Sequence, residues 1–176
     1  SYTLMELDST TGITENYWGD ISGSGNNADL YGGYSITTFN GYDVLNLNGV
    51  DSYVLPFNGF GSLLNTSLGF TYEMWVYPTT TNDGTLITEW GGSPPNGWQD
   101  AQLAFVNGTI NFGVYNIGHV VGPTYSANTW YHLVMTYYNN VTKLFVNGVE
   151  YGTPLNGTKL TTDPIFLTLG LPDNAG

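Results

Sequence analysis

Apolar residues in this chain come in short runs that alternate with turn-forming residues. The clearest runs are Tyr131–Tyr138 and Val141–Val146, which are rich in the aromatic and β-branched residues that suit strands. Between them, Asn139-Asn140 tolerates the left-handed conformations of a tight hairpin. Asn147-Gly148 turns the chain again into Val149–Thr153, since Asn-Gly between strand-like runs is a strong hairpin signal. The pattern predicts a three-stranded meander.

The same pattern predicts strands elsewhere and no helix, because no window combines helical periodicity with capping residues. The other predicted strands are Tyr2–Leu7, Tyr42–Leu47, Ser52–Leu55, Phe70–Tyr77, Leu86–Trp90, Ala101–Val106, Thr109–Tyr115, His119–Val121 and Ile165–Leu169. Asn48-Gly49 and Asn107-Gly108 each predict a hairpin. The continuous apolar run Phe70–Tyr77 predicts a strand covered on both faces. Turn-forming residues predict a long loop over 20–30 and an exposed loop over 91–97.

About a dozen strands with tight turns predict an all-β fold, an antiparallel β-sandwich. The 176 residues are expected to form a single domain, 1–176. A chain of this length buries roughly 70% of its unfolded surface, so its core requires no disulfide or metal. The sequence contains no cysteine, and no apolar run approaches the roughly 18 residues of a membrane span.

Charged residues are scarce and mostly acidic. They make up 9% of the chain, the net charge is −12, and Lys143 and Lys159 are the only cations. Two lysines cannot neutralise a phosphate backbone, which excludes nucleic acid as a partner. A nearly uncharged surface with 14 tyrosines favours packing against another macromolecule, because few charges must be desolvated.

Four Asn-x-Ser/Thr sequons begin at Asn65, Asn107, Asn140 and Asn156. Three of the four fall in predicted turns, where a glycan can be accommodated. The sequons therefore predict a glycoprotein exposed outside the cell, on a cell surface or on a virion.

Four motifs in order along nearly the whole chain carry a family resemblance. They read DISGSGNNA at residues 20–28, LNGVDSYV at 47–54, FTYEMWVYP at 70–78 and TWYH at 129–132, the last followed by VNG at 146–148. In these motifs the sequence resembles the laminin-G-like branch of the concanavalin A-like lectin/glucanase jelly rolls. The resemblance implies two curved antiparallel sheets packed face to face.

The end of the sequence departs from this family. Members usually continue past the strand matching Ile165–Leu169 into a closing strand with an acidic pair, whereas this sequence ends at Gly176. A missing strand would leave N–H and C=O groups unpaired beside Ile165–Leu169, which invites pairing with another chain. Two explanations stay open: the sequence stops short of the strand, or a neighbour supplies it.

Some family members bind a structural calcium ion through the acidic loop. The resemblance implies that Asp20, Asn26 and the Gly25 carbonyl group would supply oxygen ligands here. The acids of the closing strand are absent, so such a site would be partial. The alternative is that Asp20 and Asn26 hydrogen-bond to the backbone of their own loop.

Catalysis by these jelly rolls uses Glu-x-Asp-x-x-Glu on a central strand, where period-two spacing aims the acids into one cleft. Glu6 and Asp8 match the first half of that motif, but Thr11 replaces the last glutamate, on an N-terminal strand. The other acids are isolated in sequence; they include Glu73, Glu89 and Asp100. The sequence therefore predicts a protein that is not an enzyme.

Neither histidine indicates a catalytic or metal site. His132 lies in an apolar strand and is predicted to be a hydrogen-bonded core residue, and His119 has no neighbouring partner in the sequence. With no cysteine and no Gly-x-Ser-x-Gly turn, zinc sites and nucleophilic triads have no support.

Aromatic and amide residues near predicted loops favour sugar binding, since sugars present apolar faces to rings and hydroxyls to polar groups. The predicted ligand-binding residues are Trp98, Asn96, Asp100 and Tyr125. The alternative is that Trp98 packs at the start of a strand. We expect a non-catalytic module for adhesion or glycan recognition, binding glycans or other protein subunits. A structural subunit of a filament, coat or surface layer is the alternative, and a glycoside hydrolase is the third possibility.

Overall fold

The computed structural model describes residues 5–8, 12–14, 16–56, 69–91, 94, 99–114, 116–158 and 166–170. Within these residues the chain forms fifteen β-strands and no helix, which confirms the all-β prediction. The strands are β1 (Ile13–Thr14), β2 (Tyr17–Trp18), β3 (Ala28–Tyr31), β4 (Ser35–Phe39), β5 (Tyr42–Asn46), β6 (Tyr53–Pro56), β7 (Gly69–Val76), β8 (Gly84–Trp90), β9 (Gln99–Val106), β10 (Thr109–Val114), β11 (Gly118–Thr124), β12 (Tyr131–Tyr138), β13 (Val141–Val146), β14 (Val149–Asn156) and β15 (Phe166–Leu169).

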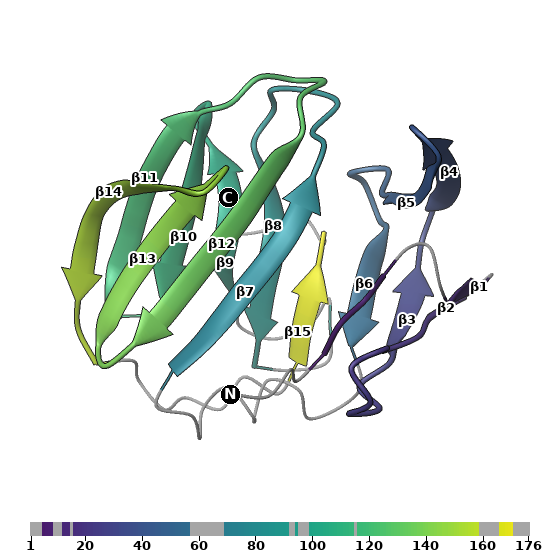
Figure 1. The fold of residues 1–176 in the computed structure, drawn as a ribbon, viewed down its shortest axis with the longest axis horizontal. Coiled ribbons are helices and arrows are strands. Elements are labelled where there is room, and N and C mark those ends of the chain that lie inside the picture. The colour runs from purple at the N-terminus through teal and green to yellow at the C-terminus, as the bar shows by residue number, and fades with distance from the viewer. Residues whose placement is uncertain are drawn as a thin grey trace.

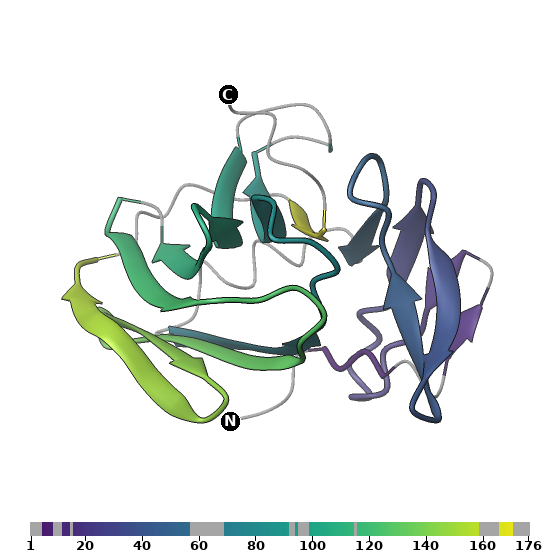
Figure 2. The same ribbon diagram turned by 90° about the horizontal axis from the view of Figure 1, so that it is seen from above.

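The strands form three antiparallel sheets. A nine-stranded sheet has the order β1-β2-β3-β6-β15-β8-β9-β10-β11, a four-stranded sheet has the order β14-β13-β12-β7, and β4 pairs with β5 alone. Figures 1 and 2 show the four-stranded sheet facing the part of the large sheet that contains β8 to β11, with β1 to β6 extending to one side. This is the predicted sandwich of two packed layers.

The main core fills the space between the two layers. Alternate side chains of β12 and β13 are buried, as period-two geometry requires. Leu133, Met135 and Leu144 of the small sheet belong to one cluster with Leu103 and Phe112 of the large sheet, all fully buried. The alternation read from the sequence therefore sets which face of the meander is inside.

Tight turns join the strands of the meander and of the β9–β10 hairpin. Both central residues have positive φ in each turn: 49° and 64° at Asn139-Asn140, 52° and 80° at Asn147-Gly148, and 50° and 76° at Asn107-Gly108. Two consecutive positive φ angles define the turn that matches the twist of paired strands. These three hairpins are confirmed.

The predicted hairpin around Asn48-Gly49 is wrong. β5 pairs with β4, which was not predicted, while β6 pairs with β3 and β15 in another sheet. The Asn48 side-chain oxygen accepts N–H bonds from Val50, Asp51 and Ser52, at 2.8, 3.1 and 3.2 Å. These bonds fold the chain into a wider local turn, so β6 leaves the plane of β5.

Two N-terminal predictions also need correction. Residues 28–30, predicted as loop, are buried and exposed in alternation and form part of β3. Of the predicted strand 2–7, only 5–7 are among the described residues, and Leu7 makes an isolated bridge to Asp20.

In the predicted exposed loop 91–97, the structure describes Gly91 and Pro94, and Pro94 is buried.

β7 is not covered on both faces as predicted. It is the last strand of the four-stranded sheet, and it alternates between core and solvent. Tyr72 is 8% exposed, whereas Trp75 on the opposite face is 65% exposed. The overlooked signal is Glu73 in the middle of the run, since a charged residue at an alternate position indicates one solvated face.

The last described strand does not border an open edge. β15 lies inside the large sheet, paired with β8 over four residues and with β6 at Leu169. The expectation of an unpaired edge beside residues 165–169 is therefore wrong. Within the part of the chain that the structure describes, the small sheet ends in two strands of eight residues: β7, which pairs with β12, and β14, which pairs with β13.

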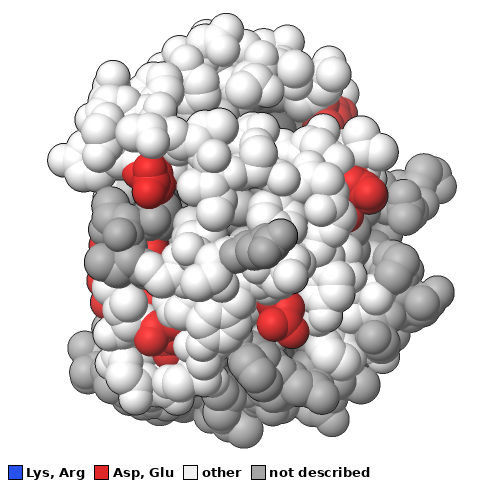
Figure 3. Space-filling model, turned by 90° about the vertical axis from the view of Figure 1, so that its right-hand side faces the viewer, with Lys and Arg blue, Asp and Glu red and all other residues white. Residues whose placement is uncertain are grey.

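Among the described residues, the charged side chains on the side of the molecule formed by β1 to β6 are carboxylates. Figure 3 shows acidic side chains on this face, and Lys143, the described lysine, lies on β13 of the small sheet. The described part of the chain contains no helix with the length and hydrophobicity needed to cross a bilayer.

Candidate functional site

Of the four ligand-binding residues predicted from sequence, the structure describes the side chain of Tyr125 alone. Asn96 and Trp98 lie outside the described residues, and the backbone of Asp100 lies in β9. Tyr125 is only 6% exposed; its ring stacks on Phe105 with 4.2 Å between centroids, and its hydroxyl donates to the Asn82 carbonyl oxygen at 2.8 Å. Tyr125 is thus a core residue in this structure.

Two acids that are separate in sequence share one rung of the large sheet. Glu89 and Asp100 are direct partners across β8 and β9. Glu89 is 1% exposed, so a saccharide cannot reach its carboxyl group in this structure. Burial, followed by the charge of nearby Glu89, raises the pKa of the Tyr72 hydroxyl far above its ordinary value. The phenol therefore stays neutral inside the sandwich.

Asp20 organises the acidic loop through its carboxylate. Oδ1 accepts N–H bonds from Glu6 and Ser22, both at 2.9 Å, and Oδ2 accepts one from Asn26 at 2.8 Å. Burial alone would raise the pKa of Asp20, but these hydrogen bonds outweigh it and lower the pKa below the ordinary value. The loop is thereby tied to the segment before β1.

This arrangement agrees with the alternative to a calcium site, in which Asp20 hydrogen-bonds to backbone groups of its own loop. Calcium requires several free oxygen ligands, and the carboxylate of Asp20 already accepts three backbone N–H groups. No group of three or more acidic or histidine side chains suited to a metal exists among the described residues. Calcium binding by Asp20 and Asn26 stays a prediction.

Three sequons can be placed on the structure. Asn107 and Asn140 lie in tight turns with positive φ, and Asn156 is the last residue of β14. All three are exposed, whereas Asn65 lies outside the described residues. The positions are accessible to a glycan, and their occupancy stays a prediction.

A different group of residues gathers on the solvent side of β7 and β12, which we call the outer β7–β12 face. The two strands pair without a bulge from Tyr131↔Val76 to Tyr138↔Gly69. Period-two geometry therefore places four side-chain positions of each strand on this face. They are Gly69, Thr71, Glu73 and Trp75 of β7, and His132, Val134, Thr136 and Tyr138 of β12.

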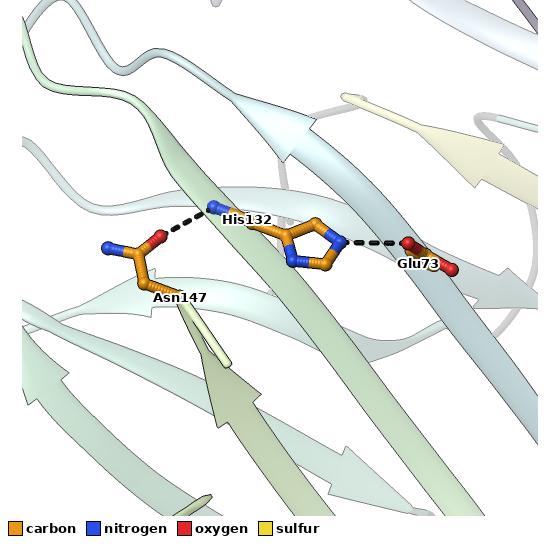
Figure 4. A network of polar contacts seen from close by, with 3 residues as sticks. All are labelled: Glu73, His132 and Asn147. Atoms are coloured by element: carbon orange, nitrogen blue, oxygen red, sulfur yellow. Dashed lines mark hydrogen bonds and ion pairs between the residues drawn. The ribbon is translucent and has the colours of Figure 1, made fainter. Parts of the chain in front are cut away.

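Trp75 and His132 are direct partners at one end of this face. Their rings stack with 4.8 Å between centroids and 24° between planes. His132 Nε2 lies 2.8 Å from Oε1 of Glu73, and because a carboxylate only accepts, the hydrogen resides on Nε2 (Figure 4). Asn147 fixes the backbone of His132 from the other side: its Oδ1 accepts the His132 N–H at 2.9 Å, and its own N–H donates to the His132 carbonyl at 2.8 Å.

His132 is therefore not the core residue predicted from sequence. Its side chain is 24% exposed on the outer face, and the Glu73 side chain is 65% exposed. Sequence reasoning treated Glu73 as isolated because the two residues are 59 positions apart. Only the register of β7 against β12 brings them together.

Further aromatic rings extend this end of the face. Tyr77 follows β7, Trp130 precedes β12, and their centroids lie 5.3 Å apart. Phe39, at the end of β4, contacts both rings with centroid distances of 5.1 and 5.7 Å. The small β4–β5 sheet is thus anchored beside Trp75 by aromatic packing.

The other end of the face carries Tyr138, which is 62% exposed. Its ring lies against Gly69, where a Cβ would come within 2.9 Å of Tyr138 Cδ2. A hollow of about 370 Å³ lies beside it, lined by Thr136, Tyr138, Asn139, Val141 and Lys143. The outer face thus has an aromatic ring at each end, with polar and small side chains between.

The sequence profile of one family matches most of the chain. It is a laminin G-type family described as the concanavalin A-like lectin/glucanases superfamily, and the match covers residues 48–172. No curated protein sequence matches at a significant level.

Solved structures share the fold at low sequence identity. Domain 4 of an extracellular arabinanase from Geobacillus stearothermophilus, in complex with arabinotriose, has a TM-score of 0.62 and 19% identity over 94% of this chain and 79% of that chain. Botulinum neurotoxin type C has a TM-score of 0.62 and 14% identity over 98% of this chain and 44% of the toxin chain. A Trypanosoma rangeli sialidase has a TM-score of 0.68 and 13% identity over 98% of this chain and 28% of the enzyme.

This chain spans less than half of the toxin and sialidase chains, so the likeness concerns one part of each. The two packed antiparallel sheets agree with the matched profile. The chain belongs to the concanavalin A-like lectin/glucanase superfamily, in its laminin G-type branch.

Proposed function

We propose that this chain is a non-catalytic carbohydrate-binding domain that acts outside the cell and binds its ligand on the outer β7–β12 face, at Trp75. The observation that carries the proposal is the large indole, 65% exposed and held flat on His132. A tryptophan this exposed, on a rigid strand and not on a loop, has no role in the core.

The chemistry around Trp75 suits a sugar. The apolar C–H face of a pyranose or furanose ring can pack on the indole, while its hydroxyls meet fixed polar groups at the edge. Glu73 offers an exposed carboxylate oxygen, since only Oε1 is bonded to His132. The ring and the acid are both placed by the strand pair, so little freedom is lost on binding.

The spacing of the acids on the proposed binding face supports a non-catalytic role. Glycoside hydrolysis requires two carboxyl groups about 5–10 Å apart. On the outer side of the small sheet, Glu73 and Glu150 lie on strands three places apart, which corresponds to ~14 Å. Glu89 is buried.

The relatives support a binding role outside the cell. The arabinanase domain was solved with arabinotriose and comes from an extracellular enzyme, and the neurotoxin structure concerns ganglioside-dependent cell entry. The exposed sequons at Asn107, Asn140 and Asn156 agree with that location. Mass spectrometry of protein from its natural source should find glycan on at least one of them.

A structural subunit remains the second candidate function, and the free edge of β7 favours it. Eight residues of β7, from Gly69 to Val76, have a partner strand on one side only within the described residues. A long open edge can pair with a strand of another chain. Light scattering at rising concentration tests this, and a protein that stays monomeric throughout would contradict it.

A glycan array tests the carbohydrate proposal. Wild type is compared with Trp75→Ala and with Tyr31→Ala, a matched control that removes another exposed stacked ring, on β3. We expect wild type and Tyr31→Ala to bind the same glycans and Trp75→Ala to bind none. An array with no signal for the wild type would overturn the function, and unchanged binding by Trp75→Ala would overturn the location.

A further inference from the structure

Both aromatic ends of the outer β7–β12 face are built across the same strand pair. At one end Trp75 of β7 stacks on His132 of β12, and at the other Tyr138 of β12 lies against Gly69 of β7. Each ring therefore covers the seam between the two strands. The absence of a side chain at Gly69 leaves the space that Tyr138 occupies.

The separation of the two rings sets the length of a ligand that contacts both. Trp75 is opposite His132, and Tyr138 is six residues further along β12 in unbroken register. Six residues of extended strand correspond to ~20 Å. A single sugar covers one ring, so a mono- or disaccharide can contact only one end.

The surface between the rings can accept a chain lying along it. The two intervening rungs are Glu73↔Val134 and Thr71↔Thr136, so no large side chain stands between the ends. Thr71 and Thr136 present hydroxyl groups, and Glu73 is the one charged residue of these two rungs. Such a stripe suits the hydroxyl-rich edge of a neutral polymer.

The hollow beside Tyr138 gives the far end a second set of contacts. Lys143 lines it and holds Glu150 at 3.1 Å, so its charge is already compensated. The hollow is lined by Thr136, Asn139 and Val141 as well, which offer hydroxyl, amide and apolar contacts. A sugar seated there needs no charge of its own.

We infer that the ligand is an unbranched, neutral saccharide chain that lies along β7 and β12 and contacts Trp75 with one part and Tyr138 with another. This inference rests on the proposed carbohydrate-binding function and adds the ligand's shape and length. Joining two weak contacts in one ligand makes the second contact intramolecular, so the affinity rises once the chain is long enough to reach both rings.

The experiment is a length series measured by calorimetry. The probes are cello-, xylo-, manno-, chito- and arabino-oligosaccharides of two to eight sugars. For wild type we expect a rise in affinity of about tenfold between the di- and the hexasaccharide in at least one series. Tyr138→Ala should lose this rise while keeping the disaccharide affinity, Trp75→Ala should lose affinity at every length, and Tyr31→Ala should behave as wild type.

Each outcome decides the inference. Equal affinity at all lengths, or an equal loss by Tyr138→Ala on di- and hexasaccharides, would overturn it and leave the carbohydrate function standing. Binding confined to compact or branched glycans on the array, with none to these linear probes, would do the same. No binding to any glycan would overturn the proposed function and the inference together. Circular dichroism of each variant confirms that it is folded.

Discussion

The imidazole of His132 lies over the indole of Trp75, with 4.8 Å between ring centroids and 24° between ring planes. The two residues are neighbours across β7 and β12. His132 is held in turn by Glu73 through its ring and by Asn147 through its backbone. The exposed indole thus lies on an imidazole that is itself held through its ring and its backbone.

A double-mutant cycle measures this contact. Stacked aromatic pairs contribute about 1 kcal/mol beyond burial, so Trp75→Ala, His132→Ala and the double variant should give a coupling energy of about that size in urea unfolding. A coupling within measurement error of zero would show that the stack does not hold the ring.

Gly69→Ala should lower the free energy of unfolding by about 2 kcal/mol, because overpacking against a fixed neighbour strains the backbone. The added Cβ would meet the Tyr137 carbonyl oxygen and the Tyr138 ring. Gly84→Ala is the matched control at the first residue of β8, where a Cβ would meet nothing. Urea unfolding should show the control within about 0.5 kcal/mol of wild type; equal losses would refute the steric explanation.

Two buried tyrosines should respond in opposite ways to loss of the hydroxyl. The Tyr137 hydroxyl donates to Asn140 Oδ1 at 3.0 Å, whereas the Tyr72 hydroxyl has no hydrogen-bond partner among the described residues. Tyr137→Phe should cost about 1 kcal/mol of unfolding free energy, and Tyr72→Phe should be neutral or stabilising by a similar amount. Both rings contact Phe70, which makes the pair well matched. A loss in Tyr72→Phe as large as in Tyr137→Phe would contradict the assignment.

Asp20 should contribute stability that depends on pH. Burial raises its pKa, but the hydrogen bonds from Glu6, Ser22 and Asn26 prevail, and the folded-state pKa lies below the ordinary 3.8. A lowered pKa means that the contribution is complete above about pH 4 and is lost as the pH falls through the folded-state value. Asp20→Asn should therefore be about 1–2 kcal/mol less stable than wild type at pH 7.

The difference between wild type and Asp20→Asn should shrink below pH 4, as measured by urea unfolding from pH 7 to pH 2.5. Asp29→Asn, an exposed acid on β3, is the control and should follow wild type. A constant difference across this range would show that the carboxylate charge is not the cause.

The same variants test calcium binding. An ion held by Asp20 would raise the free energy of unfolding of wild type and of Asp29→Asn on addition of calcium chloride, but not that of Asp20→Asn.

Local chemistry made the hairpins predictable. Asn139-Asn140, Asn147-Gly148 and Asn107-Gly108 are the residues that tolerate consecutive positive φ, so the turns and their flanking strands follow from neighbours in sequence. The same turn rule wrongly paired β6 with β5. The turn at Asn48 is wider than a two-residue hairpin because the Asn48 side-chain oxygen bonds to the backbone N–H groups of Val50 and Ser52, which the Asn-Gly motif does not predict.

The candidate site was beyond prediction for a different reason. Trp75, Glu73 and His132 come from two strands separated by more than fifty residues, and their contact exists only in the register of β7 against β12. A shift of one residue in the register of β7 against β12 would point the Trp75 side chain into the core. Sequence reasoning instead favoured Trp98, Asn96, Asp100 and Tyr125. Only the Tyr125 side chain is described, and it is buried against Phe105.

The sequence by itself determined that this chain is an antiparallel sandwich with few charges, because turn residues, period-two alternation and charge are local properties. Tertiary structure alone decided that β7 lies at an edge with one solvated face, that β15 is enclosed by neighbours, and that two rings mark the ends of one strand pair. Those relationships are contacts between strands that are distant in sequence. The free energy of pairing two strands depends on the cross-strand side chains of both, so neither strand by itself specifies its partner.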